Sequence, residues 1–314
     1  QRVTKIIFYV PLQQPIVFEI EGFDILPGSG PFFFLLALLV YMLVLLGNGV
    51  VVCTLSDPRL TSPMYFFLQN LSFVDLVYTT TTIPNMLAGF LMDQLTISIP
   101  GCFLQMYFFT QLAVTGRAIL TVMAYDRYLA VCNPLRYTAI MTRSVRMLLV
   151  TGAWSFGLLC TLPPRVLAFL RPYCGPNMVR HSWCDLSSVR TLACADTSID
   201  NVLSLSFAMV ALLTTGVLIL TSYFLIATSM YQMGVPERLK AFSTCAAHLT
   251  VVSISYSAAS FVYISYRVRI IVSVLYSALT PFLNPMIYSL RNKELRIAIR
   301  KTLASFRPAA TMAN

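Results

Sequence analysis

Two ionisable residues, Asp126 and Arg127, stand at the end of a stretch that is otherwise mostly apolar. The preceding residues read FLQMYFFTQLAVTGRAILTVMAY, which is long enough for a helix in a membrane. Placing an ionisable pair at the end of such a helix costs free energy, so the pair is by default a candidate functional site. Its chemistry depends on the elements that position it.

The composition predicts an integral membrane protein. Of 314 residues, 57% are hydrophobic and 11% are charged, whereas a soluble domain carries about 25% charged residues. Apolar runs long enough to cross a bilayer (about 20 residues) fall at 31–55, 63–89, 99–132, 145–169, 201–230, 241–265 and 270–290. Backbone groups in lipid must be hydrogen-bonded internally, and the runs are continuous rather than short and alternating. We therefore predict an all-α membrane protein with a seven-transmembrane helix bundle, not a β-barrel.

Basic residues are unevenly distributed between the two sides of the predicted bundle. With the N-terminus outside, the inner loops and ends hold 13 Arg and Lys residues against four Asp and Glu, and the outer side holds eight against seven. Cytoplasmic loops carry the excess of positive charge, so we expect an extracellular N-terminus and a cytoplasmic C-terminus. The topology signal and affinity for anionic lipid account for the basic face, and no nucleic-acid partner is expected.

Four of the eight cysteines, Cys102, Cys174, Cys184 and Cys194, fall on the predicted outer side. Disulfides are the expected state there, and four cysteines permit three pairings. Zinc binding by three of them with His181 is an alternative, but their spacing does not resemble a close-ligand zinc motif. The loop at 170–199 exceeds the usual length of an unstructured connection, so we interpret it as a lid over the bundle.

Three classes of function are compatible with seven helices. A transporter would show internal repeats, and none is found between the halves. An enzyme would show a cluster of nucleophile, base or metal ligands, but the two histidines, His181 and His248, fall on opposite sides of the membrane. A receptor requires an outer pocket, a movable helix and an inner docking face, and the sequence offers all three. We therefore expect no enzyme activity, no cofactor and no metal.

Several long motifs resemble those of vertebrate olfactory receptors, which are rhodopsin-like (class A) G-protein-coupled receptors. The resemblance covers about residues 22 to 304. It is carried by MAYDRYLAVCNPLRY (123–137), KAFSTCAAHL (240–249), PFLNPMIYSLRN (281–292), PMYFFLQNLSFVDL (63–76), GN (47–48) and SY (222–223).

The resemblance implies an odorant receptor in the plasma membrane that binds a small volatile or water-soluble odorant and activates a heterotrimeric G protein, of the stimulatory olfactory type acting through cyclic AMP. It implies an extracellular segment at 1–30, a bundle at 31–290, and a cytoplasmic short amphipathic helix eight with a tail at 291–314. The apolar residues of helix eight would face the lipid bilayer. The alternative is a related receptor outside the nose that senses a small metabolite such as a carboxylic acid.

The resemblance also assigns roles to individual residues. Asp126 would restrain Arg127 until activation, when Arg127 meets the G protein. The other residues implied for the activation switch and for G-protein coupling are Tyr128, Tyr223, Arg238, Lys240, Asn284, Pro285 and Tyr288. A buried polar network would join Asn48, Asp75 and Asn284, and Asn284 would satisfy backbone groups freed by Pro285. The family pattern pairs Cys102 with Cys184, and Cys174 with Cys194.

By the same analogy, the odorant would lie in the outer half of the bundle. The residues implied to line its site are mostly apolar with scattered hydroxyls, as suits a small molecule with one polar end. They are Met106, Phe109, Thr110, Ala113, Val114, Phe207, Ala211, Tyr256, Ala259, Ser260, Tyr263 and Ser277. Arg267 either extends to the membrane interface or captures a carboxylate by a charge-assisted hydrogen bond.

The chain departs from the family pattern in helix three. Olfactory receptors usually carry an acid there, opposite the helix-two Asp, and this chain has Gly116 followed by Arg117. An Arg at mid-helix costs roughly 2.5–3.5 kcal/mol on insertion scales, so it should have a partner. We hypothesise that Arg117 reaches Asp75 or nearby carbonyls and takes the place of a sodium ion; alternatively it forms hydrogen bonds elsewhere in the interior.

Overall fold

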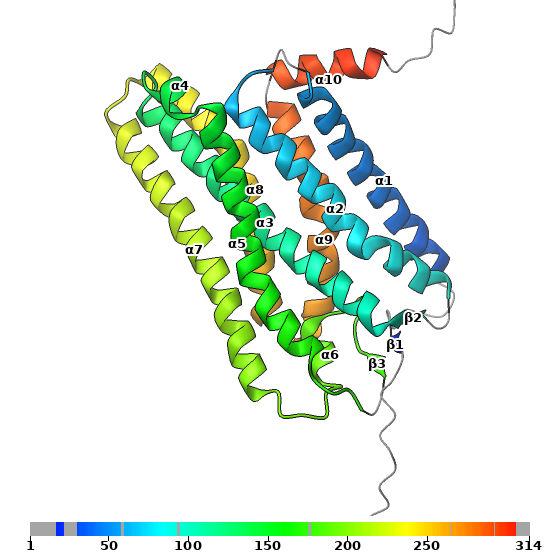
Figure 1. The fold of residues 1–314 in the computed structure, drawn as a ribbon. Coiled ribbons are helices and arrows are strands. Elements are labelled where there is room, and N and C mark those ends of the chain that lie inside the picture. Colours follow the sequence, from blue (N-terminus) through cyan, green and yellow to red (C-terminus); the bar gives the residue numbers. More distant parts are fainter. Residues whose placement is uncertain are drawn as a thin grey trace, which may run out of the picture.

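The computed structural model describes residues 17–21, 30–57, 60–92, 95–174, 177–264, 266–291 and 293–305, with side chains except at 240, 244, 258–276, 290–293 and 305. Within these ranges, seven helices of at least 26 residues form a bundle (Figure 1). They cover the seven apolar runs predicted from the sequence. They are α1 (Gly30–Leu55), α2 (Pro63–Leu91), α3 (Ile99–Cys132), α5 (Arg143–Phe169), α7 (Ser198–Tyr231), α8 (Val235–Ile264) and α9 (Tyr266–Arg291).

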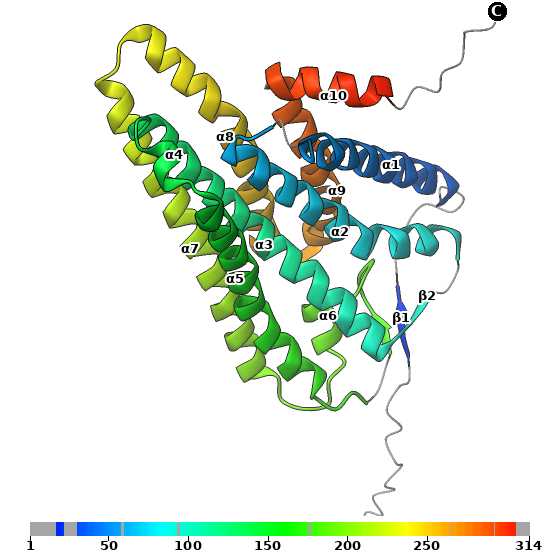
Figure 2. The same cartoon turned by 45° about the horizontal axis from the view of Figure 1, so that its top comes forward.

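Shorter elements lie at the two ends of the bundle. At one end, which we call the α10 end, lie α4 (Tyr137–Ile140) and α10 (Lys293–Ser305), and α10 runs across the bundle while packing against α1 and α9 (Figures 1 and 2). At the opposite end, the sheet end, lie α6 (Leu186–Arg190) and the strands β1 (Val17–Ile20), β2 (Leu95–Ser98) and β3 (Met178–Val179).

The three strands form one small sheet in the order β2-β1-β3. Strand β1 is antiparallel to β2, with Phe18 opposite Ile97, and parallel to β3, with Ile20 opposite Val179. No strand is predicted from the sequence in the N-terminal segment. It forms one here because Phe18 is fully buried, with its ring edge-on to Tyr173.

Helix α3 is the central element of the fold. Ser98 caps its start by accepting a hydrogen bond from the Gly101 N–H, and the helix ends at Cys132, just before the Asn133–Pro134 step. It packs against α2, α5, α7 and α8, and against the sheet. Any group on α3 is therefore surrounded by helices on several sides, which makes α3 the scaffold for both ends of the bundle.

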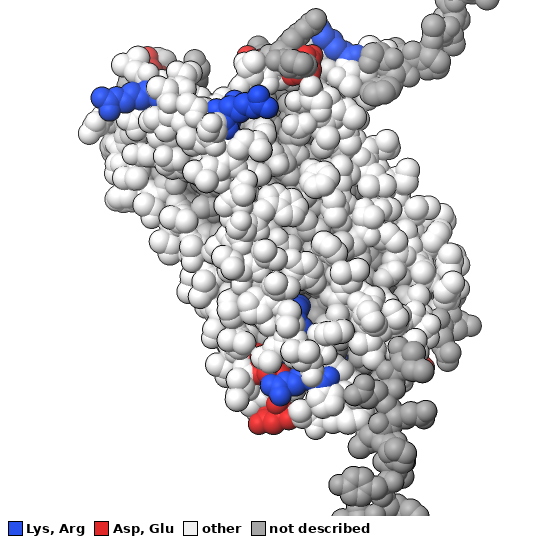
Figure 3. Space-filling model, in the orientation of Figure 1, with Lys and Arg blue, Asp and Glu red and all other residues white. Residues whose placement is uncertain are grey.

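The surface agrees with a membrane protein. On the face drawn in Figure 3, charged residues gather at the two ends, and the band between them is almost without charge. Leucines such as Leu35, Leu39 and Leu220 are more than half exposed on the outer faces of α1 and α7. Among the described residues, four helices (α1, α3, α5 and α7) are individually long and apolar enough to cross a membrane.

Gly157 determines how closely α5 approaches α3. A methyl group at this position would overlap the Thr115 hydroxyl and crowd the Gln111 side chain. Those two residues, both on α3, are hydrogen-bonded to each other, and Gln111 also accepts a hydrogen bond from Thr161 on α5 at 3.0 Å. The small residue therefore allows the polar contact between the two helices.

We expect Gly157→Ala to lower the thermal unfolding midpoint and the amount of protein at the cell surface, because it separates α5 from α3. Gly152→Ala is the matched control, since Gly152 lies on the same helix with nothing within 4 Å of an added methyl group. The control should be neutral or stabilising by up to about 1 kcal/mol, the helix-propensity gain of Ala over Gly. Equal midpoints for the two variants would contradict the packing role.

Candidate functional site

At the α10 end, Asp126 and Arg127 form a buried ion pair. The Arg127 Nη2 atom lies 3.1 Å from Asp126 Oδ2, and the two side chains are 9% and 1% exposed. Tyr137, on α4, donates its hydroxyl hydrogen to Asp126 Oδ1 at 2.7 Å. Burial and the neighbouring Asp126 raise the pKa of Tyr137 above its ordinary value, so the hydroxyl stays protonated and keeps donating. The carboxylate is thus held from both sides.

His248 connects three helices near this pair. Its Nε2 atom lies 3.0 Å from the Leu120 carbonyl oxygen on α3, and its Nδ1 atom lies 2.7 Å from the Tyr223 hydroxyl on α7. A carbonyl only accepts, so Nε2 carries the hydrogen; in the neutral imidazole Nδ1 is then the acceptor for the Tyr223 hydroxyl. The sequence placed His248 across the membrane from His181 and indicated no partner for it, because nothing in the sequence links α8 to α3.

The other residues predicted for the switch lie around the same end. Tyr288 is buried and Tyr128 is half-buried, whereas Arg238 is exposed and donates to the Met233 carbonyl. The Lys240 side chain lies outside the described residues.

The polar network predicted between α1, α2 and α9 consists of two separate hydrogen bonds. Asn284 donates to Asp75 Oδ2 at 2.6 Å, and Asn48 donates to the Pro281 carbonyl at 2.8 Å. Pro285 has no N–H, so it leaves the Pro281 carbonyl without its helical partner. The expectation that Asn284 satisfies the freed group is therefore wrong: Asn48 does so from α1, because Asn284 is turned to the carboxylate.

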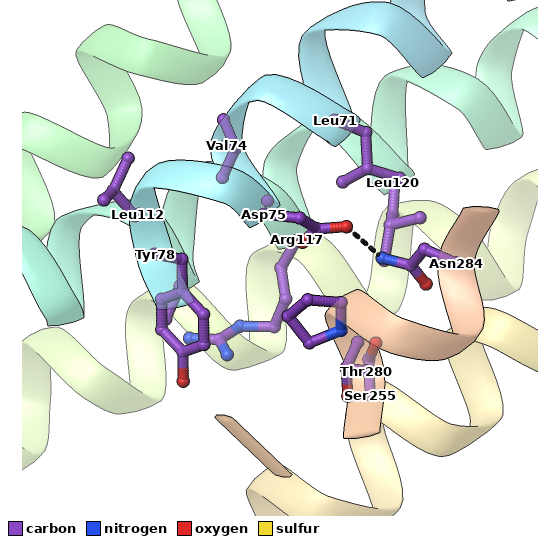
Figure 4. A pocket seen from close by; sticks show the side chains of 13 residues that line it. Leu71, Val74, Asp75, Tyr78, Leu112, Arg117, Leu120, Ser255, Thr280 and Asn284 are labelled. Carbon is purple, nitrogen blue, oxygen red and sulfur yellow. Dashed lines mark hydrogen bonds between the residues drawn. The ribbon is translucent and has the colours of Figure 1, made fainter. Parts of the chain in front are cut away.

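Arg117 points away from Asp75. Figure 4 shows the Asp75 carboxylate directed at Asn284 and the Arg117 guanidinium turned away from that carboxylate; Arg117 and Tyr78 line the same cavity. The two ion pairs among the described residues are Asp126–Arg127 and Asp200–Arg171, so Arg117 and Asp75 do not form one. The second alternative from the sequence, a contact elsewhere in the interior, fits this orientation. A small cavity of about 30 Å³ is lined by both Arg117 and Asp75. That Arg117 takes the place of a sodium ion stays a prediction.

At the sheet end, a larger cavity of about 380 Å³ lies under the lid and is lined there by side chains from residues 181–190; we call it the lid cavity. Small-molecule sites typically have about 300–1,000 Å³. Six residues predicted to bind the ligand line it: Phe109, Thr110, Ala113, Val114, Phe207 and Ala211. An aromatic series runs along one wall, where Phe109 stacks on Tyr78 at 4.9 Å and meets Trp183 at 5.4 Å between ring centroids.

Three other predicted ligand residues lie elsewhere. Met106 is buried in the apolar cluster beneath the sheet, and Ser277 is buried in α9. Tyr256 donates to the Thr215 hydroxyl at 2.6 Å and so connects α8 to α7. The side chains of Ala259, Ser260, Tyr263 and Arg267 lie outside the described residues, so their ligand role stays a prediction.

Two disulfides hold the lid. Cys102 is bonded to Cys184, and Cys174 to Cys194, which confirms the pairing that the resemblance implied. Three cysteines of the zinc alternative are consumed by these bonds, so that alternative is wrong. The first bond attaches the lid to the start of α3, and the Cys184 N–H donates to Gln105 on α3 at 3.2 Å.

The lid is also attached to the start of α7. Arg171 makes two hydrogen bonds to the Asp200 carboxylate, at 2.7 and 2.8 Å. Hydrogen bonding to Asp200 raises the pKa of Arg171.

Sequence reasoning missed two arginines in the wall of the lid cavity, Arg165 and Arg190. Arg165 lies in α5 and donates to the Thr110 hydroxyl at 2.9 Å. Arg190, in the lid, donates to Asn201 and Ser204 of α7 at 2.6 and 2.5 Å. The sequence places Arg190 only in a long loop, and no motif signals that the loop turns inward.

Known proteins resemble this chain over most of its length. A family profile described as "Olfactory receptor" matches residues 37–305. Mouse olfactory receptor 5G25 is 44% identical over 277 residues, covering 86% of this chain and 87% of that protein. Human olfactory receptor 6N1 is 45% identical over 296 residues, covering 91% and 94%, and human olfactory receptor 13C2 is 39% identical over 302 residues, covering 92% and 95%.

Proposed function

The chain belongs to the olfactory receptor family, and from that premise we propose that it binds an odorant in the lid cavity and activates a heterotrimeric G protein at the α10 end. The observation that carries this proposal is that one helix, α3, contributes residues both to the lid cavity at the sheet end and to the ion pair at the α10 end. Phe109, Thr110 and Ala113 of α3 line the lid cavity, and the Asp126–Arg127 pair lies farther along the same helix. At a rise of 1.5 Å per residue, the two sites are roughly 20 Å apart.

The sheet end is extracellular in this proposal, and the α10 end is cytoplasmic. The excess of basic residues on the α10 side supports this orientation, and the two disulfides at the sheet end agree with an oxidising compartment. Helix α10 lies along the inner membrane surface in this proposal, with the exposed Arg296 and Arg300 at the lipid headgroups. The expectation that its apolar residues face lipid is wrong for Leu295, which is fully buried against the bundle.

Activation breaks a restraint that is already assembled in this conformation. Arg127 is paired with Asp126, and α8 is attached to α3 through His248 and Leu120. An odorant that binds better to the conformation with α8 swung outward shifts the population toward it. Arg127 then meets the G protein, in a cleft framed by basic residues including Arg136, Arg143 and Arg238. Coupling to the stimulatory olfactory G protein, with cyclic AMP as the product signal, follows the family.

His248→Phe should raise ligand-independent cyclic AMP severalfold. The variant keeps an aromatic ring but loses the hydrogen bonds to Leu120 and Tyr223, each contributing about 1 kcal/mol net. Thr250→Val on the same helix is the control, since the exposed Thr250 hydroxyl bonds only within α8. Basal signals are compared at equal surface amounts, and a basal level in His248→Phe no higher than in the control would contradict the restraint.

The proposed function is tested by cyclic AMP measurement in cells that express the full chain, across a panel of odorants and with surface staining in parallel. A concentration-dependent rise that Arg127→Ala abolishes at equal surface amount is the expected result. No rise to any compound, despite surface staining equal to that of a responding receptor, would count against it.

A further inference from the structure

We propose that the lid cavity takes a small organic acid and that Arg190 binds its carboxylate. The inference rests on the proposed function, because it names the ligand class of the same site. It uses a different arginine from Arg267, on which the sequence-based acid hypothesis depends. The geometry of the cavity wall carries it.

Charge in the cavity wall is predominantly positive. Among the described residues that line it are three arginines, Arg117, Arg165 and Arg190, and one carboxylate, Asp185. Asp185 is engaged as the cap of α6, where it accepts hydrogen bonds from the backbone N–H groups of Ser187 and Ser188. The described wall therefore presents an excess of guanidinium groups, and an anion neutralises part of it.

Of the three arginines, Arg190 has the environment that best suits a bound anion. It is only 7% exposed, and its Nε atom has no hydrogen-bond partner. Its other nitrogens donate to the neutral groups of Asn201 and Ser204, and it takes part in neither of the two ion pairs among the described residues. Burial lowers the pKa of Arg190, and the carboxylates of Asp200 and Asp185 act on it in the opposite direction without pairing with it directly. Asp200 is paired with Arg171 instead, and the guanidinium of Arg190 remains charged at neutral pH. A carboxylate offers two acceptor oxygens in the geometry that a guanidinium matches.

The rest of the wall suits the remainder of such a ligand. Phe109, Phe207 and Ala211 provide apolar surface, and about 380 Å³ accommodates a short aliphatic chain. Polar residues of α6 and the start of α7 line one part of the cavity, and apolar residues of α3 and α7 line another part, which also contains Arg117 of α3 and Arg165 of α5. An amphiphile with one acidic end fits that division.

The test compares linear carboxylates from butanoate to decanoate with their methyl esters, which keep the chain and remove the charge. In cells expressing the full chain, we expect cyclic AMP responses to the acids at concentrations at least roughly tenfold lower than to the esters. Arg190→Gln should weaken the acid responses at least roughly tenfold and leave ester responses in place. Arg190→Lys, which keeps the charge, should retain part of the acid preference.

Arg180→Gln is the matched control, because Arg180 is an exposed arginine of the same lid that does not line the cavity. It should behave like the parent chain. Arg190 also contacts α7, so its replacement could disturb folding; responses to the esters that persist in Arg190→Gln show that this variant is folded.

If Arg190→Gln does not reach the surface, Arg165→Gln is used instead. It also removes a positive charge from the cavity wall and should reduce the acid preference. Equal responses to acids and esters in the parent chain would overturn the inference while leaving the receptor function intact.

A binding measurement separates the inference from the proposed function. Octanoate should raise the thermal unfolding midpoint of the purified full-length protein more than methyl octanoate does, since a ligand stabilises the folded state to which it binds. Stabilisation by octanoate without any cyclic AMP response would keep the acid site and overturn the signalling proposal. The absence of any octanoate-specific stabilisation would overturn the acid site.

Discussion

Asp126→Asn should raise ligand-independent cyclic AMP by roughly tenfold, the factor that corresponds to 1.4 kcal/mol of lost restraint. The substitution keeps the shape of the side chain but removes the charge that holds Arg127 at 3.1 Å. Breaking a buried pair by removing one partner leaves the other charge without compensation, which is strongly unfavourable. Arg127 then gains free energy by leaving the pair, and the conformation with α8 outward becomes more populated.

Tyr137→Phe should have a smaller effect in the same direction, since it removes one hydrogen bond to the carboxylate and leaves the ion pair. Tyr125→Phe is the control, because Tyr125 lies next to Asp126 on α3 and is 38% exposed. The measurement is basal cyclic AMP normalised to surface staining. The restraint is contradicted if Asp126→Asn reaches the surface normally and signals at the level of Tyr125→Phe.

Cys184→Ser should remove most of the protein from the cell surface and abolish its response to ligand. The bond between Cys102 and Cys184 closes a sequence separation of 82 residues, and the bond between Cys174 and Cys194 closes one of 20. The chain-entropy model assigns about 4.5 kcal/mol to the longer closure and about 3.3 kcal/mol to the shorter. The longer closure also attaches the lid to α3, so its loss affects the position of Arg190 and Trp183 over the cavity.

Cys174→Ser should therefore be the milder of the two disulfide variants, with part of the response retained. Cys53→Ser is the control, since Cys53 is an exposed free cysteine of α1. Surface staining, thermal midpoint and response are measured for all three. A Cys184→Ser variant that matches Cys53→Ser in all three measurements would show that the lid is held by its other contacts, chiefly the Arg171–Asp200 pair.

Contacts within one element, or set by one long motif, could be predicted from the sequence. The seven apolar runs predicted the seven long helices, because lipid leaves a continuous apolar segment few alternatives to a helix. Asp126 and Arg127 are adjacent in the sequence, so their ion pair could be predicted from it. The family pattern correctly paired the four cysteines. The same pattern grouped Phe109, Thr110, Ala113 and Val114, and all four line the lid cavity, since α3 runs through the middle of the fold.

Contacts between segments that are distant in the sequence could be identified only from the tertiary structure. Asn48 satisfies the carbonyl that Pro285 frees, across 233 positions in the sequence, and His248 reaches Leu120 across 128. Strand β1 exists because Phe18 is buried beside Tyr173, a contact that no local pattern encodes. Arg190 is a candidate ligand residue because it lines the lid cavity and its Nε atom has no hydrogen-bond partner, and neither property can be seen in the sequence. The sequence determined the helices and their order through local hydrophobicity, whereas the tertiary structure decided which polar groups meet, because such groups must find partners wherever packing brings them.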